Sequence, residues 1–160
     1  MSAIASVTVL PKTALPLLRE AATPKKSLFG SAKDGFPKVL AQNGRPLGDY
    51  PWSGYVLATL LPFLEEARGI DLMKSEYGDL ASLLAEKRGA TYFFITQDHK
   101  KWLADLDPVK FGDDELRDYY NEFNEAQESD AGQPMLDGVR FLREAVAAVD
   151  ASTVALLSIS

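Results

Sequence analysis

The chain has 160 residues, of which 46% are apolar and 25% charged, with no cysteine, one histidine and a formal net charge of −6. This length suffices to bury a hydrophobic core without a disulfide or a structural metal. The absence of cysteine excludes disulfide scaffolds, thiolate zinc sites, iron–sulfur clusters and cysteine nucleophiles, and the single imidazole of His99 excludes metal motifs with two histidines.

The charge is unevenly distributed along the chain. Residues 1–48 carry seven basic and two acidic side chains, whereas residues 98–130 carry four basic and eleven acidic ones. Because phosphate contacts need a surplus of Lys and Arg, the acidic total predicts no nucleic-acid partner. The first ten residues lack the basic start of a signal peptide, and no apolar window reaches the length of a membrane span. We therefore expect a cytoplasmic protein that makes no membrane contact.

The chain begins with a predicted strand and a predicted helix. Residues 3–10 are rich in β-branched side chains and stop at Pro11, which is typical of a strand. Thr13 offers a capping oxygen for a leucine-rich helix that should end before Thr23 and Pro24.

Residues 23–49 are basic and rich in Gly, Pro and Ser, and we expect an irregular loop there. Within it, the Asn43–Gly44 pair predicts a tight hairpin over residues 38–48, and Pro46 places its second arm at a sheet edge. A local basic patch is an open possibility in this segment, formed by Lys25, Lys26, Lys33, Lys38 and Arg45.

Two helices are predicted next. Residues 52–68 are apolar around most of a helix circumference, which indicates a buried helix, and Pro62 in its interior predicts a kink or a second helix start. Gly69 is the expected stop of this helix. A second helix is predicted over residues 79–88.

The second half of the chain alternates helices with two apolar runs. Residues 90–96 form a continuous apolar and aromatic run that predicts a central strand, followed by a helical turn or two. Asp113 should cap an amphipathic helix with Tyr119, Tyr120 and Phe123 facing inward, and a last helix leads into a strand over residues 152–160. These elements predict one α+β domain over residues 1–160, with a small mixed sheet of about three to five strands packed with four to six helices.

The most plausible catalytic group follows the 90–96 strand. Groups at the carboxyl end of a strand often line a ligand crevice, and histidine is the usual general base near neutral pH. His99, oriented by Asp98 or a distant carboxylate, is therefore a candidate base of a small hydrolase or transferase, with residues 23–49 as its lid. The alternative is a surface turn or a helix start capped by Asp98, which is favoured because no nucleophile motif accompanies the histidine.

Neither a metal nor a cofactor is predicted. Asp105, Asp107 and Asp113 supply oxygen atoms, but Gly112 and Pro108 do not fit the spacing of a calcium loop. No phosphate-binding glycine pattern is present, and the aromatic stripes are expected to be core.

One segment resembles a known family. Residues 52–61, Trp-Ser-Gly-Tyr-Val-Leu-Ala-Thr-Leu-Leu, are similar to the Trp-x-x-hydrophobic-x-aromatic-Leu-Leu helix of the small bacterial YfbM-like family. The order of an opening strand, a Pro-initiated helix, a mid-chain acidic helix and a late helix before a terminal strand is similar too. Tyr50–Pro51 and Pro62 depart from the family pattern. The resemblance implies an α+β fold and a cytosolic bacterial setting. The family has no assigned catalytic residues, so it implies no residue roles for this chain.

The leading functional hypothesis is a non-enzymatic bacterial protein-binding protein, in the general style of small acidic immunity proteins that block a toxin domain. A concentrated acidic face speeds association with a basic partner. Tyr119 or Tyr120 is the expected aromatic anchor. The predicted docking carboxylates are those of Asp114, Glu115, Asp118, Glu122 and Glu125. A further alternative is a homo-oligomeric structural protein, such as a homodimer, whose helix at 53–68 is buried at the interface.

Overall fold

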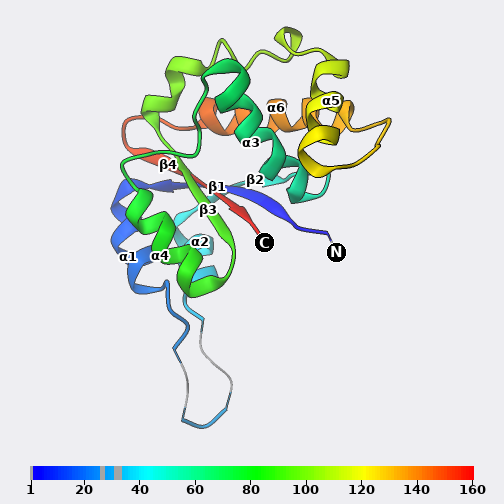
Figure 1. The fold of residues 1–160 in the computed structure, drawn as a ribbon. Helices are drawn as coiled ribbons and strands as arrows, with labels where there is room; N and C mark the ends of the chain where they lie inside the picture. The colour runs from blue at the N-terminus through cyan, green and yellow to red at the C-terminus, as the bar shows by residue number, and fades with distance from the viewer. Residues whose placement is uncertain (1, 26–27, 31–33) are drawn as a thin grey trace.

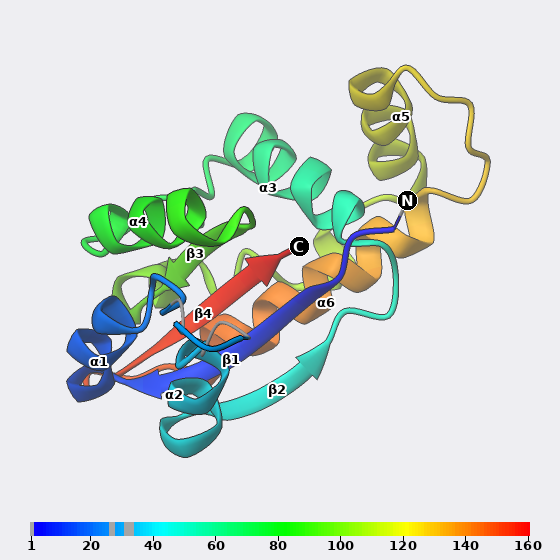
Figure 2. The ribbon, with the colours of Figure 1, turned by 90° about the horizontal axis from the view of Figure 1, so that it is seen from below.

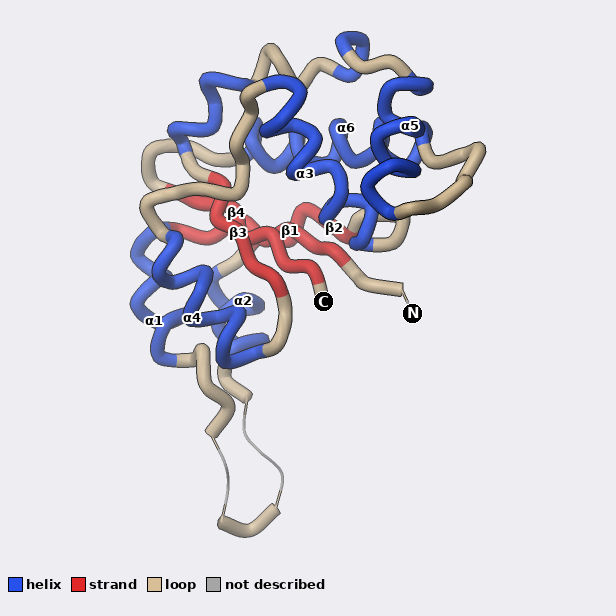
Figure 3. The backbone as a smooth tube through the Cα atoms, viewed as in Figure 1, coloured by secondary structure: helices blue, strands red, loops and turns tan. Residues whose placement is uncertain are grey.

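A four-stranded sheet runs through the middle of the molecule, with helices on both faces (Figure 1). The computed structural model describes residues 2–25, 28–30 and 34–160. The strands are β1 (Ala5–Pro11), β2 (Arg45–Asp49), β3 (Thr91–Ile95) and β4 (Thr153–Ile159), in the spatial order β2-β1-β4-β3. The described residues thus form the α+β domain that the sequence predicts, coloured by secondary structure in Figure 3.

The three strand pairs among the described residues are all antiparallel, so this part of the chain does not form the expected mixed sheet. The physical reason lies in the connections between paired strands. Arg45, which starts β2, pairs with Val9 near the end of β1, and Ala155 near the start of β4 pairs with Ile95 at the end of β3. Each connection therefore returns the chain to the end of the sheet that it left, which makes the neighbouring strands antiparallel.

The prediction that residues 90–96 form a central strand is wrong. β3 lies at one edge of the sheet and pairs with β4, and the two central strands are β1 and β4. β3 is apolar on both faces because helices cover both: Tyr92 and Phe94 pack into one core cluster and Ile95 into the other. A covered edge strand therefore shows the same apolar run as a central one.

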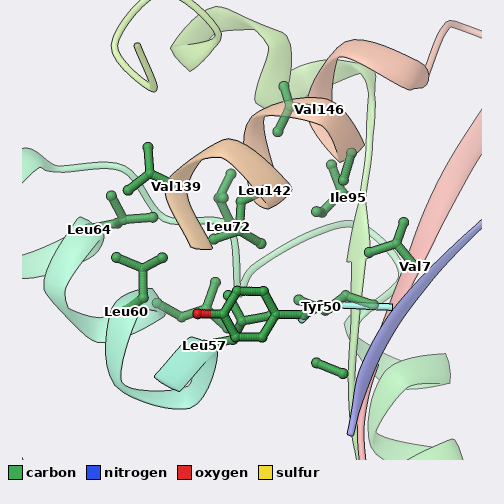
Figure 4. Packing of buried hydrophobic residues seen from close by; sticks show 14 of the residues in the cluster. Val7, Tyr50, Leu57, Leu60, Leu64, Leu72, Ile95, Val139, Leu142 and Val146 are labelled. Carbon is green, nitrogen blue, oxygen red and sulfur yellow. The ribbon is translucent and has the colours of Figure 1, made fainter. Parts of the chain in front are cut away.

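One face of the sheet is covered by α3 (Gly54–Arg68) and α6 (Gly132–Ala148), against which α5 (Asp113–Asn124) packs. Figure 4 shows side chains of α3, α6 and the sheet in the larger core, among them Leu57 and Leu60 of α3, Leu142 of α6 and Val7 of β1. Ser53 begins α3 by accepting a hydrogen bond from the Tyr55 amide, and Gly69 ends it in the left-handed conformation. The helix predicted over 52–68 is thereby confirmed, and it continues past Pro62.

The other face carries α1 (Leu15–Glu20), α2 (Phe36–Asn43) and α4 (Gly78–Arg88), seen in Figure 2 from below. They cover a second core cluster that includes Leu18, Phe36 and Leu84. Short 3-10 helices complete the chain at η1 (Lys12–Ala14), η2 (Gln97–Trp102) and η3 (Pro108–Lys110).

The hairpin predicted over 38–48 is wrong, because residues 36–43 form α2 and residues 45–49 form β2. Gly44 is not needed for a tight turn. A side-chain carbon at Gly44 would lie 2.4 Å from the Thr8 methyl group, so glycine allows α2 to approach β1 closely. Pro46 does lie in an edge strand, as expected. Of the basic patch considered in this segment, Lys26 and Lys33 lie outside the described residues.

Two predicted helix caps are also wrong. Thr13 lies inside η1, and the residue before α1 is Ala14, which makes no side-chain cap. Asp113 is the first residue of α5, and the capping position belongs to Gly112. Both helices still begin near the predicted place, because Pro16 lies in the first turn of α1 and three acidic residues lie in the first turn of α5. Within the described residues, no helix is long and apolar enough to span a membrane.

Candidate protein-binding surface

His99 is buried, with 4% of its surface exposed, and both of its ring nitrogens bond to the main chain. The Thr96 amide donates to Nδ1 at 2.9 Å, and Nε2 lies 2.8 Å from the Lys74 carbonyl oxygen. Since Nδ1 accepts, the proton must be on Nε2, which donates to that carbonyl. The imidazole is therefore neutral and joins the loop at Lys74 to the start of η2.

This geometry does not support His99 as a general base. Burial lowers the pKa of the imidazole, and neither nitrogen is left to take a proton from a substrate. Asp98 bonds to neither ring nitrogen. Nor does α2, the helix within the predicted lid of residues 23–49, cover His99, because it packs on the face of the sheet opposite to α6, which η2 contacts. In the described part of the chain, no group of three or more His, Asp or Glu side chains is placed to hold a metal ion.

Four of the five acidic residues predicted as docking carboxylates on the 113–125 helix form one exposed stripe. Asp114, Asp118, Glu122 and Glu125 recur at helical spacing and are exposed. Arg117 bonds to Asp114 and to Asp118, each at 2.9 Å, so these two carboxylates are paired. Glu122 and Glu125 form no ion pair with any residue that the structure describes. Unpaired negative charge is thus concentrated at the carboxyl end of α5.

That position is unfavourable for acidic side chains. The carbonyl groups at the end of a helix carry partial negative charge, and the last turn of α5 has no basic residue. Glu125 also has a φ of 50°, a left-handed conformation usually taken by glycine. Stability alone does not explain a glutamate there, and strained backbone of this kind is often found at functional sites.

Glu115 is not part of the free stripe. Both of its carboxylate oxygens accept hydrogen bonds from Arg68 at 2.8 Å, which lowers the pKa of Glu115. The Arg68 guanidinium in turn lies over the rings of Phe63 and Phe111. Glu115 therefore holds α5 to the end of α3. The two bonded residues are 47 positions apart in the chain, so only the folded structure shows this contact.

Tyr119 is half-buried and also bonds within the molecule. Its hydroxyl donates to Glu66 at 2.9 Å, and burial together with this carboxylate raises the pKa of Tyr119 to about 12. Its ring lies between those of Phe63 and Phe123. Phe123 is expected from the sequence to face inward, but 51% of its surface is exposed. Its ring stacks on Tyr119 and lies outside the core cluster. It is an exposed aromatic beside Glu122.

A second exposed aromatic lies just before the start of α3. Trp52, expected to be core, is 45% exposed, and its indole Nε1 donates to Asp137 at 2.9 Å. Beside it lies a hollow of about 340 Å³, which we name the Trp52 hollow. It is lined by Trp52, Val56, Tyr120, Glu128, Asp130, Ala131, Gln133 and Pro134. The apolar pattern of residues 52–68 does not indicate this hollow, although Trp52 precedes the helix cap and so lies outside the buried helical stripe.

Comparison of the chain with protein-family models, with curated proteins and with solved structures gave no match. The resemblance of residues 52–61 to the YfbM-like family therefore stays a prediction.

Proposed function

We propose that this protein is a non-enzymatic binding protein that docks a basic protein domain through the exposed acidic side of α5. The supporting observation is that the carboxylates of Glu122 and Glu125 form no ion pair among the described residues. They lie at the end of α5, which is unfavourable for negative charge, beside the exposed ring of Phe123. Unpaired charge steers a partner of opposite sign, and an exposed ring supplies the apolar contact that charge alone lacks.

An immunity protein that neutralises a toxin domain in the bacterial cytoplasm is the form of this function that we favour. An acidic, aromatic-bearing surface can occlude a cationic cleft of the kind that nucleases use. The homodimer alternative has less support, because the apolar side chains of α3 that suggested it are covered by α6 and the sheet of the same chain. The general-base alternative has less support because both nitrogens of His99 are occupied.

The test compares the protein with a Glu122→Lys/Glu125→Lys variant. Each form captures proteins from a lysate of the source cells, and the captured basic protein is identified by mass spectrometry and then purified. We expect the variant to associate with it at least about tenfold more slowly than the unmodified protein at about 50 mM salt, and the difference to shrink at about 300 mM. Inhibition of the captured domain's activity at equimolar ratio tests the immunity function.

A matched control reverses two carboxylates on the opposite face of the sheet. Glu76→Lys/Glu86→Lys changes the net charge equally, but Glu86 lies in α4 and Glu76 just before it. Association that slows equally in both variants would indicate a general charge effect, and association unchanged by the α5 variant would refute the proposed function.

A further inference from the structure

We propose that the Trp52 hollow receives an arginine side chain from the protein partner. This inference rests on the proposed function, since it names the chemistry of one partner residue. The hollow lies beside α5, because Tyr120 of that helix forms part of its lining.

The aromatic wall of the hollow is held in place before any ligand binds. Asp137 accepts the indole proton of Trp52 and also accepts hydrogen bonds from Gln133 at 2.9 Å and Arg140 at 2.8 Å. Three donors therefore fix this carboxylate, and it fixes the edge of the indole. A ring that is already oriented loses little conformational entropy when a flat group stacks on it.

Two acidic residues lie in the lining of the hollow. Glu128 and Asp130 belong to its lining, which includes no Lys or Arg among the described residues. The main chain of Glu128 is anchored, because its amide donates to the Asn121 side chain at 2.8 Å and its carbonyl accepts from the same side chain at 3.0 Å. Neither carboxylate forms an ion pair within the described ranges. Asp130 accepts a hydrogen bond of 3.3 Å from the Ser129 hydroxyl.

Arginine is the side chain that matches this combination. Its planar guanidinium stacks on an indole and donates in a fork that suits a carboxylate, and its aliphatic stem suits the apolar surface of Val56 and Pro134. An apolar side chain would desolvate the two carboxylates without compensation, and an acidic one would be repelled. The volume of about 340 Å³ is at the small end of ligand sites, which suits one long side chain better than a helix.

The experiment follows the two indole N–H signals in a ¹⁵N-correlated NMR spectrum during titration with acetyl-Gly-Arg-Gly-amide. The chain has two tryptophans, so Trp102, which stacks on His99, serves as an internal control. We expect a saturable shift of the Trp52 signal with a dissociation constant of about 1 mM, while the Trp102 signal does not move. The citrulline peptide, which keeps the shape without the charge, should bind at least about tenfold more weakly.

Paired variants identify the carboxylates responsible. Glu128→Gln/Asp130→Asn should weaken binding at least about tenfold, whereas Glu76→Gln/Glu86→Gln, with the same change in net charge, should leave it unaltered. The dispersion of each spectrum confirms that the variant is folded. Equal shifts of both indoles, undiminished binding by the Glu128/Asp130 variant, or a lysine peptide that binds as tightly would each overturn the inference.

The peptide result is independent of the test of α5. Failure of the peptide to bind, with partner association still dependent on Glu122 and Glu125, would remove the arginine inference alone. Saturable peptide binding without any partner that depends on α5 would remove the proposed function and leave the hollow as an arginine site.

Discussion

At the scale of single residues, His99 makes the stability of the folded protein depend on pH. Its folded-state pKa lies below the ordinary value of 6.5, because burial disfavours the charged ring. Between these two pKa values the unfolded chain binds a proton that the folded protein does not, so stability rises with pH. The contribution of His99 is therefore fully present above about pH 6.5 and is lost as the pH falls toward the folded pKa.

We predict that the free energy of unfolding, measured by urea denaturation, decreases from about pH 7.5 to about pH 5.5 in the unmodified protein. In His99→Asn this dependence should vanish, because no other histidine titrates in that interval. The variant should be less stable at the higher pH by about 1–3 kcal/mol, since the Lys74 carbonyl loses its donor.

The two carboxylates that bidentate arginine pairs hold do not interfere with this measurement. The pKa values of Asp34 and Glu115 are lowered by Arg88 and Arg68, so their contributions to stability persist down to their ordinary values of 3.8 and 4.5. An equal slope in the His99→Asn variant would show that another group is responsible.

At the scale of one element, variants at the end of α5 separate the effect of backbone strain on stability from the effect of charge. Glu125 adopts the left-handed conformation that costs a residue with a side chain about 1–2 kcal/mol. Glu125→Gly relieves this strain and removes a carboxylate from the negative end of the helix. We predict that it raises the melting temperature by roughly 2–4 °C in thermal unfolding followed by circular dichroism.

Glu125→Ala is the matched control, because it removes the same charge and keeps the strained backbone. It should gain less stability than the glycine variant, while both should slow association with the basic partner equally. Similar melting temperatures for the two variants would mean that the left-handed backbone at residue 125 does not lower the stability of the protein.

At the scale of the whole molecule, two helical glycines test how tertiary packing overrides local preference. Gly78, the first residue of α4, has open space where a side-chain carbon would lie. At Gly138 in α6, the same carbon would lie 2.7 Å from Leu60 and 3.0 Å from Leu57 of α3. Helix propensity alone favours alanine at both positions.

We predict opposite outcomes for the two substitutions. Gly78→Ala should leave the free energy of unfolding unchanged or raise it by up to about 1 kcal/mol. Gly138→Ala should lower it by about 1–3 kcal/mol, because it forces α3 and α6 apart in the core. Urea denaturation of both variants measures the difference, and stabilisation by Gly138→Ala would contradict the close packing of these helices.

Much of the element content of this fold could be predicted from local pattern. The apolar residues of 54–68 and the stop at Gly69 indicate α3 correctly. The β-branched residues of β1 indicate that strand correctly. The place of β3 at the sheet edge could not be predicted, because apolar runs record burial on two faces and not the number of strand neighbours. The Asn43–Gly44 pair misled for a similar reason, since a close helix–strand approach and a tight turn both require glycine.

The candidate surface likewise has one part that local pattern predicts and another part that depends on the fold. The acidic stripe of Asp114, Asp118 and Glu122 follows from helical spacing alone, so the position of negative charge along α5 can be predicted from local pattern. The folded chain is needed to know which carboxylates are paired within the molecule, as Glu115 is with Arg68, and to place Trp52 in the same lining as Glu128 and Asp130. Helical periodicity acts over a few residues, whereas charge pairing and hollow shape depend on distances between segments remote in the chain.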